Sequence, residues 1–190
     1  QKEEVKTVIL VNRYVSTLVH EFGHSLGLRH NFAGSTDGEN FYTKSEAQIL
    51  GLVDAPAYSS VMDYAFSEFN ELGSFGKYDV AALGYAYSGG MKTKDGSLVK
   101  VSDKTTLKAF RSSHNAKINT EFEKAAKEVG IPDEQIGNAY EMLKEASADE
   151  RYTPEVRAVF ADIVKIADQK IVDFEYCTDE NASLSTKCNR

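Results

Sequence analysis

The residues with the clearest capacity for chemistry lie in one short stretch, His20 to His30, which reads HEFGHSLGLRH. This stretch matches the pattern HExxHxxGxxH at every defined position. Three neutral imidazoles are a ligand set for a catalytic zinc ion, whose fourth position stays open for water. His20 and His24 are four residues apart, so a helix places both rings on one face, where Glu21 can reach that water as a general base. The stretch therefore predicts a Zn²⁺ site with His20, His24 and His30 as ligands.

Gly27 explains how the third histidine reaches the same metal. Glycine adopts a left-handed backbone conformation without steric cost, so it can end the helix abruptly and let the chain turn back. His30 then approaches the metal from outside the helix. The shorter pattern HExxH also occurs in unrelated helices, where two histidines only form hydrogen bonds on one helix face. Gly27 and His30 at fixed spacing argue against that alternative.

A second element, Ser60 to Tyr64 (SVMDY), follows the histidines and resembles the Met-turn of the metzincin zinc peptidases. The resemblance implies that Met62 lies beneath the three histidines and supports the metal site; the alternative is an ordinary core methionine. In some metzincins a tyrosine at the offset of Tyr64 binds zinc in the resting enzyme and then stabilises the oxyanion. A phenol suits both roles, because it is a weak ligand and a hydrogen-bond donor. The alternative for Tyr64 is packing under the site.

The resemblance extends over four stretches: HEFGHSLGLRHNFAGS at 20–35, SSVMDY at 59–64, FGKYDVAALGYAY at 75–87 and FEYCTDENASLSTKCNR at 174–190. They look like a large bacterial group of secreted or periplasmic zinc metallopeptidases of the metzincin type, some of them catalogued as domains of unknown function. Asn31, directly after the third histidine, is a candidate to hydrogen-bond a zinc ligand, to bond the turn backbone or to cap the turn. We expect a role in the turn.

The function that the resemblance implies is zinc-dependent endopeptidase activity on a peptide or protein substrate. Glu21 would take a proton from a zinc-activated water as it attacks a peptide carbonyl, and would return the proton to the leaving amine. Tyr64 would help to stabilise the oxyanion. Two readings from other classes stay open. One is an inactive zinc-binding fragment. The other is a helical interaction module with a structural zinc, closed by Asp63 or Tyr64 as fourth ligand.

The chain departs from the metzincin pattern before the first histidine. A metzincin catalytic domain normally begins with an upper subdomain, whose twisted sheet binds the substrate along an edge strand. Only nineteen residues precede His20, which is too few for such a sheet. We therefore expect the chain to be the lower, C-terminal part of a catalytic domain. The remainder of the parent polypeptide would be its partner.

Composition bounds the other partners and the compartment. A formal charge of −7 argues against nucleic acid or an anionic membrane as a partner, and 42% hydrophobic residues are typical of a globular chain. No apolar run is long enough to span a bilayer. Cys177 and Cys188 are either free thiols or a small disulfide-closed loop. We expect the disulfide, which fits an oxidising compartment and therefore a secreted or periplasmic protein.

The hydrophobic periodicity predicts a mainly α fold: a zincin-like lower subdomain over 1–90 and a helical extension over 91–190 with at most a small β-hairpin. The zinc helix is expected to have a broad apolar face. His114 is expected in an exposed position between helices, without a functional role. The expected helices lie at 4–27, 44–52, 78–87, around 118–129, after Pro132, and from Thr153 to about Phe174, with the hairpin at 91–103.

Overall fold

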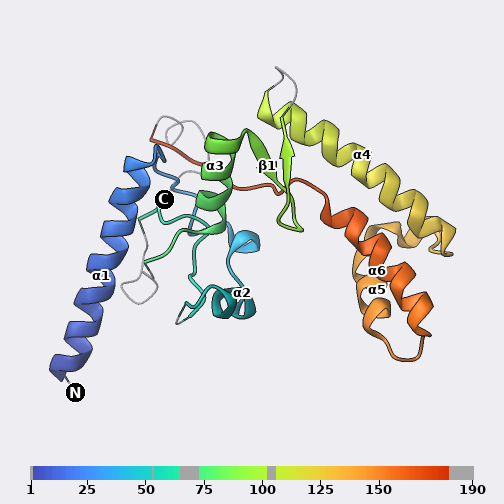
Figure 1. The fold of residues 1–190 in the computed structure, drawn as a ribbon, viewed down its shortest axis with the longest axis horizontal. Helices are drawn as coiled ribbons and strands as arrows, with labels where there is room; N and C mark the ends of the chain where they lie inside the picture. Colours follow the sequence, from blue (N-terminus) through green and yellow to red (C-terminus); the bar gives the residue numbers. More distant parts are fainter. Residues whose placement is uncertain (1, 53, 65–72, 102–105, 180–190) are drawn as a thin grey trace. The chain divides into compact units, whose positions relative to one another are not determined.

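A computed structural model describes residues 2–52, 54–64, 73–101 and 106–179 of the chain (Figure 1). The chain divides into two compact units. The first comprises Gln1–Tyr87 with Asp173–Arg190, and the second comprises Ser88–Val172. The sequence-based division at residue 90 assigned all later residues to the extension. The structure instead groups the described segment Asp173–Asp179 with the first unit, because this segment forms hydrogen bonds to the loop that follows the histidines.

The described residues are mainly helical, and their one sheet has two short strands, as the periodicity predicts. Within the described residues no helix is long and apolar enough to cross a membrane. The first unit contains α1 (Lys2–Ser25), η1 (Gly38–Asn40), α2 (Lys44–Ile49) and α3 (Lys77–Ser88). The second contains β1 (Gly90–Lys92), β2 (Leu98–Lys100), α4 (Leu107–Glu128), η2 (Asp133–Asn138), α5 (Ala139–Ala148) and α6 (Pro154–Asp168).

The second unit is a hairpin followed by a packed group of helices. β1 and β2 pair antiparallel, with Met91 opposite Val99, which confirms the predicted hairpin. The helices bury one apolar cluster, to which α4, α5 and α6 all contribute. Burying a phenylalanine, leucine or isoleucine side chain contributes on the order of 1.5–3 kcal/mol, and the small alanines between them let the helices pack closely. The buried members of the cluster are Phe122, Ala126, Ala139, Leu143, Ile163 and Ala167.

Three expectations for the second unit were wrong. α6 ends at Asp168, and Ile171 pairs instead with Thr93 of the hairpin in an isolated bridge, so its burial comes from a non-local partner. His114 lies inside α4, and its Nε2 is 3.0 Å from the backbone oxygen of Gln169. Pro132 precedes a 3₁₀ helix, η2, and the α-helix begins only at Ala139.

The first unit is organised by α1, which carries the HExxH residues near its C-terminal end. The helix ends where the sequence predicts. Gly27 has a φ of +93°, and the amides of Gly27 and Leu28 donate to the carbonyl oxygens of His24 and Gly23. The expected apolar face of α1 is present, but it is largely exposed rather than packed. Its exposed members are Val5, Val8, Val15, Leu18 and Phe22, and Leu10, Val11 and Tyr14 of the same helix are exposed as well.

The loop that holds Met62 packs directly under α1. Met62 is fully buried in a small cluster with Leu28, Tyr58 and Val61. A Cβ added to Gly23, which lies between the two helical histidines, would be 2.5 Å from the Met62 sulfur. The absence of a side chain at Gly23 therefore lets the loop approach the helix at this point.

Asp79 of α3 fixes the same loop from the other side. Its side chain is fully buried and accepts hydrogen bonds from the Ser60 hydroxyl at 2.6 Å and from the Val61 and Gly76 amides, each at 2.8 Å. Burial raises the pKa of Asp79 to about 6, while the three donors act in the opposite direction. One carboxylate from a helix thus organises the backbone of the loop that contains Met62.

We expect Gly23→Ala to destabilise the protein by about 1 kcal/mol. Overpacking against Met62 costs on the order of 1–3 kcal/mol, which outweighs the gain of about 1 kcal/mol from replacing a helical glycine. Denaturant unfolding measures the change. Gly38→Ala is the control, because an added Cβ there meets nothing within 4 Å. Equal stabilities for the two variants would contradict the close packing of Gly23 on Met62.

Asp79 should give the folding stability a recognisable pH dependence. Its folded-state pKa of about 6 lies above the ordinary value of 3.8, so the folded state binds the proton more tightly. The stabilisation is fully present below pH 4 and is lost as the pH rises to about 6, by about 3 kcal/mol. Asp79→Asn removes this titration. The difference in unfolding free energy between the native chain and the variant should therefore fall across this window. A difference that rises with pH would show that the three hydrogen-bond donors lower the pKa of Asp79 by more than burial raises it.

Candidate metal centre

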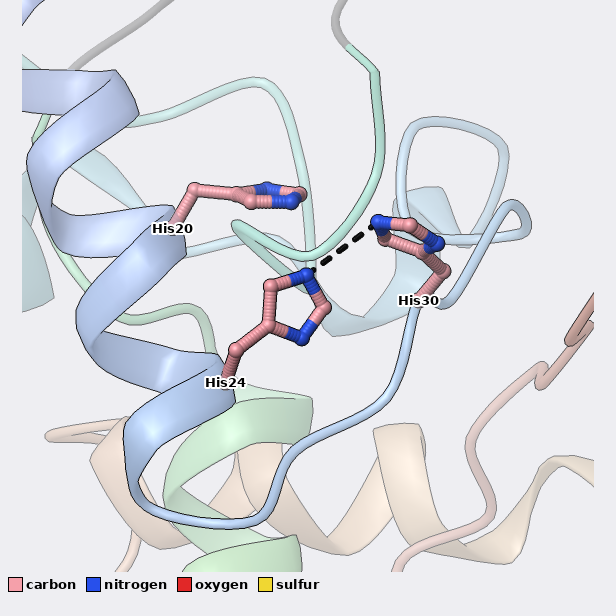
Figure 2. A group of neighbouring side chains, drawn as sticks. All are labelled: His20, His24 and His30. Atoms are coloured by element: carbon pink, nitrogen blue, oxygen red, sulfur yellow. Dashed lines mark hydrogen bonds between the residues drawn. The ribbon is translucent and has the colours of Figure 1, made fainter.

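The three histidines meet in space as the motif predicts. His20 and His24 project from α1, and His30 approaches from the loop beyond the helix end (Figure 2). One nitrogen of each ring lies within 4.8 Å of a nitrogen of each of the others. Among the described residues, these three histidines form a group of neighbouring side chains that could hold a metal ion.

Each imidazole is oriented by a hydrogen bond at Nδ1. His20 Nδ1 is 2.8 Å from the Val61 carbonyl oxygen, and His24 Nδ1 is 3.0 Å from that of Leu28. His30 Nδ1 is 3.1 Å from a carboxylate oxygen of Asp179. All three acceptors lack a proton to give, so the network assigns the proton to Nδ1 in each ring. The Nε2 lone pairs are then the ones through which the three rings could bind a metal.

The spacing of these nitrogens fits zinc. His24 Nε2 and His30 Nε2 are 3.2 Å apart (Figure 2). With both protons on Nδ1, the two nitrogens face each other as acceptors, an arrangement that a cation between them would stabilise. Two ligands of a tetrahedral zinc ion at 2.0–2.1 Å are about 3.3 Å apart, close to the observed distance. Three histidine nitrogens are also one of the ligand sets found in catalytic zinc sites.

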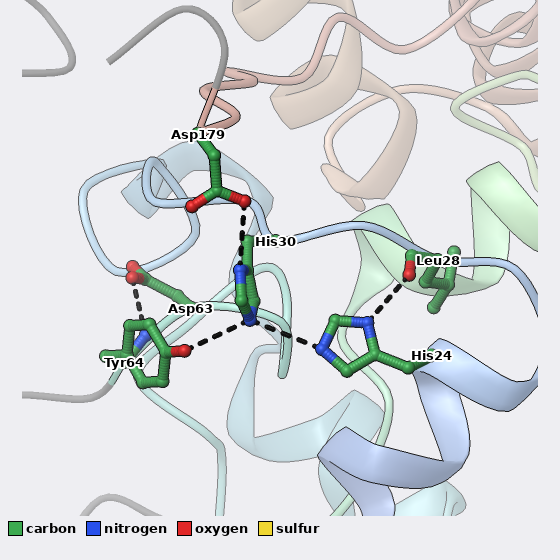
Figure 3. Close-up of polar contacts among 6 residues, drawn as sticks. All are labelled: His24, Leu28, His30, Asp63, Tyr64 and Asp179. Carbon is green, nitrogen blue, oxygen red and sulfur yellow. Dashed lines mark hydrogen bonds and ion pairs between the residues drawn. The ribbon is translucent and has the colours of Figure 1, made fainter. Parts of the chain in front are cut away.

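Of the two residues that follow Met62, Tyr64 faces the histidines and Asp63 does not. The Tyr64 hydroxyl is 3.1 Å from His30 Nε2 (Figure 3). The Tyr64 ring also stacks on that of His20. The Asp63 carboxylate instead accepts hydrogen bonds from the Tyr64 and Ser35 amides, each at 2.7 Å. Asp63 therefore shapes the turn, whereas the Tyr64 side chain contacts the rings of His20 and His30.

Glu21 opens onto the same space as the histidines. An open pocket of about 320 Å³ is lined by the three histidines, Glu21 and Tyr64, among other residues. The side chain of Glu21 is exposed, so it is accessible to water and to a substrate. The pocket thus brings together the residues that the sequence predicts for metal binding, proton transfer and oxyanion stabilisation.

Asn31 acts in the turn, as expected, but its contacts reach further. It is fully buried, and its side-chain oxygen accepts from the amides of Ala33 at 3.2 Å and Cys177 at 3.0 Å. Its side-chain nitrogen donates to the Glu175 carbonyl at 3.1 Å. Asn31 therefore binds the C-terminal segment to the residue after the third histidine.

Sequence reasoning missed Gly23, Asp79 and Asp179. Gly23 occupies an undefined position of the motif, and Asp79 and Asp179 act across long sequence separations that no local pattern encodes. Asp79 and Asp179 do lie inside stretches that carry the metzincin resemblance, which was the available signal. Cys177 is buried and disulfide-bonded, while Cys188 lies outside the described residues, so their pairing stays a prediction.

Comparison with known proteins agrees with this geometry. A family model described as Met-zincin matches residues 4–136, which include nearly all of α1, all three histidines and the Met62 loop. No curated protein and no solved structure matches the chain. The match covers well over half of the 190 residues. The chain therefore belongs to the Met-zincin family.

Proposed function

We propose that this chain carries the catalytic zinc site of an endopeptidase. The observation that carries the proposal is the convergence of three imidazoles, each offering a ring nitrogen within 4.8 Å of those of the others, with an acceptor oxygen at each Nδ1 that favours the tautomer able to bind a metal through Nε2. Membership of the Met-zincin family supports a metallopeptidase-like function. The placement of Glu21 in the same pocket supports hydrolysis rather than metal storage.

A zinc ion held by His20, His24 and His30 would supply a Lewis acid, which polarises a peptide carbonyl and makes water a stronger acid. Glu21 accepts the proton released by the attacking water and then donates it to the leaving amine. Tyr64 donates a hydrogen bond from its hydroxyl to the oxygen on which negative charge develops. The Val61, Leu28 and Asp179 oxygens keep the imidazoles fixed throughout.

A purely structural zinc is the less favourable reading. Such a site is normally closed by a fourth protein ligand. The Asp63 carboxylate is engaged by two backbone amides, and the remaining candidate, Tyr64, has a 55% exposed side chain at the open pocket. The open pocket beside the three histidines and an exposed Glu21 favour a catalytic site.

We also propose that the substrate-binding part of the enzyme is contributed by the rest of a longer polypeptide. Support comes from α1, whose apolar side chains include Val8 and Leu10, each 58% exposed. Exposed apolar patches on this scale are typical of interaction surfaces. The isolated chain then binds zinc but hydrolyses peptides poorly or not at all. The disulfide at Cys177 supports a secreted or periplasmic location, where disulfides persist.

Glu21→Gln should abolish hydrolysis by the full catalytic domain and leave zinc binding unchanged. The glutamine side chain has the same shape but cannot accept a proton, and loss of a general base costs on the order of 10²–10⁴-fold in rate. Peptide cleavage and elemental analysis of purified protein measure the two effects. Glu39→Gln, at an exposed glutamate in the same unit, is the matched control. Loss of zinc from a folded Glu21→Gln variant would contradict the base assignment.

His24→Ala tests the site itself in the 190-residue chain. The native chain should bind about one zinc ion, because three imidazoles complete its ligand set, and the variant should retain little. Elemental analysis after dialysis measures the metal content, and circular dichroism confirms the fold. A folded native chain without zinc would overturn the proposed function.

The interface on α1 predicts a change in side-chain protection. In a longer polypeptide that includes residues before Gln1, Tyr14 should lose most of its reactivity toward hydroxyl radicals, since it is 71% exposed in this chain. Mass spectrometry quantifies the oxidation. Tyr152, in the second unit, is 44% exposed and should react equally in both proteins. Equal reactivity of Tyr14 in the two proteins would argue against coverage of α1.

A further inference from the structure

The third histidine differs from the other two in what holds it. His20 and His24 lie on a helix, which restrains their backbone, and both bond to uncharged carbonyl oxygens. His30 lies in a loop, and its Nδ1 partner is a carboxylate, Asp179, at 3.1 Å (Figure 3). A carboxylate that accepts the Nδ1 proton orients a metal-binding imidazole. It also makes Nε2 more basic, so that Nε2 gives its electron pair to the metal more readily.

We propose that Asp179 is a positioning residue for His30, and that the segment Asp173–Asp179 is a strap that holds it in place. The inference rests on the proposed zinc site and deepens it. It assigns part of the metal affinity to a residue 149 positions away in the sequence from the ligand it orients. Asp179 acts through His30 and does not itself enter the metal-binding group.

The strap is bound most tightly next to His30. The side chain of Asn31, which is fully buried, bonds the strap at Cys177 N and Glu175 O. The Phe32 amide donates to the Cys177 carbonyl at 2.8 Å. Consecutive residues after the ligand thus bind the strap just before Asp179. Cys177 is 1% exposed, so this end of the strap is anchored in the interior of the unit.

A second attachment lies at the start of the strap. The Asn40 side chain donates to the Asp173 carbonyl at 2.8 Å, and the Glu175 amide donates to the Asp37 carboxylate at 3.3 Å. Asp37 and Asn40 are both buried and bonded to each other at 2.8 Å. Burial makes these hydrogen bonds costly to break, since each group would be left unsatisfied.

These anchors explain how an exposed side chain can be well placed. The Asp179 side chain is 55% exposed, so packing does not fix it. Its backbone is instead carried to His30 by the buried contacts of Asn31 and Cys177. The match to the Met-zincin family model ends at residue 136, so the partner of the third ligand lies beyond the matched part of the chain.

The test compares Asp179→Ala and Asp179→Asn in the 190-residue chain. Zinc affinity is measured by competition with a chromophoric chelator. The alanine variant should bind zinc about 10–100-fold more weakly, the effect typical of losing such a partner. The asparagine variant should lose less, because its carbonyl oxygen still accepts from Nδ1 but carries no charge. Asp162→Ala, at an exposed aspartate in the second unit, is the control and should bind like the native chain.

A second readout separates positioning from general stability. The d–d absorption of the cobalt-substituted protein reports ligand geometry and should change in Asp179→Ala while the melting temperature of the metal-free protein stays the same. Asn31→Ala should also weaken zinc binding, and Asp179→Ala added to it should cost less than it costs alone, because both act through the strap.

The outcomes are distinct. Zinc affinity within about twofold of the native value in both Asp179 variants, well below the loss expected for such a partner, would overturn the role of Asp179 and leave the zinc site intact. Independent, additive effects of Asn31→Ala and Asp179→Ala would overturn the strap. Failure of the native chain to bind zinc, together with no difference from His24→Ala, would overturn the proposed function and this inference with it.

Discussion

The hydrogen bond at Nδ1 of each histidine is the interaction on which the rest of the site depends. An imidazole can bind a metal through Nε2 only if the ring faces the metal and the proton resides on the other nitrogen. Three acceptor oxygens satisfy both conditions here, from Val61, Leu28 and Asp179. They come from three different parts of the chain. The first unit can therefore be understood as the structure that brings these three oxygens to one place.

Each acceptor has its own support. Leu28 follows from local geometry, because Gly27 ends α1 and returns the chain beside His24. Val61 depends on α3, since the buried Asp79 carboxylate binds the Val61 amide while the Val61 carbonyl faces His20. Asp179 depends on residues after His30, through Asn31. The sequence separation between a histidine and its Nδ1 acceptor thus increases from His24 to His20 and then to His30.

This gradient also explains how far the sequence predicts the site. The three histidines, Glu21 and the helix end at Gly27 follow from short spacings, the resemblance to the metzincins implied that Tyr64 lies near them, and the structure brings these residues together. The mainly helical fold follows from periodicity in the same way. The groups that orient the ligands act over long separations. A buried aspartate such as Asp79 resembles any helical aspartate in a sequence, because its burial depends on a loop from elsewhere. Ile171 shows the opposite failure. Its helical spacing predicted a helix that continues past Asp168, but Ile171 pairs with Thr93 next to the hairpin.

The surroundings of the histidines and the surface of α1 differ sharply in burial. Around the histidines, buried polar groups such as Asn31 and Asp79 have hydrogen-bond partners, and Met62 is fully enclosed. Along α1, a row of valine and leucine side chains stays in contact with water. Because apolar exposure costs about 25 cal/mol per Å², a helix of this kind gains stability when another surface covers it. The hydrogen bonds that orient the three histidines all come from within the first unit, from Val61, Leu28 and Asp179. The order around the histidines therefore does not depend on a cover over α1, whereas the burial of the apolar side chains of α1 does.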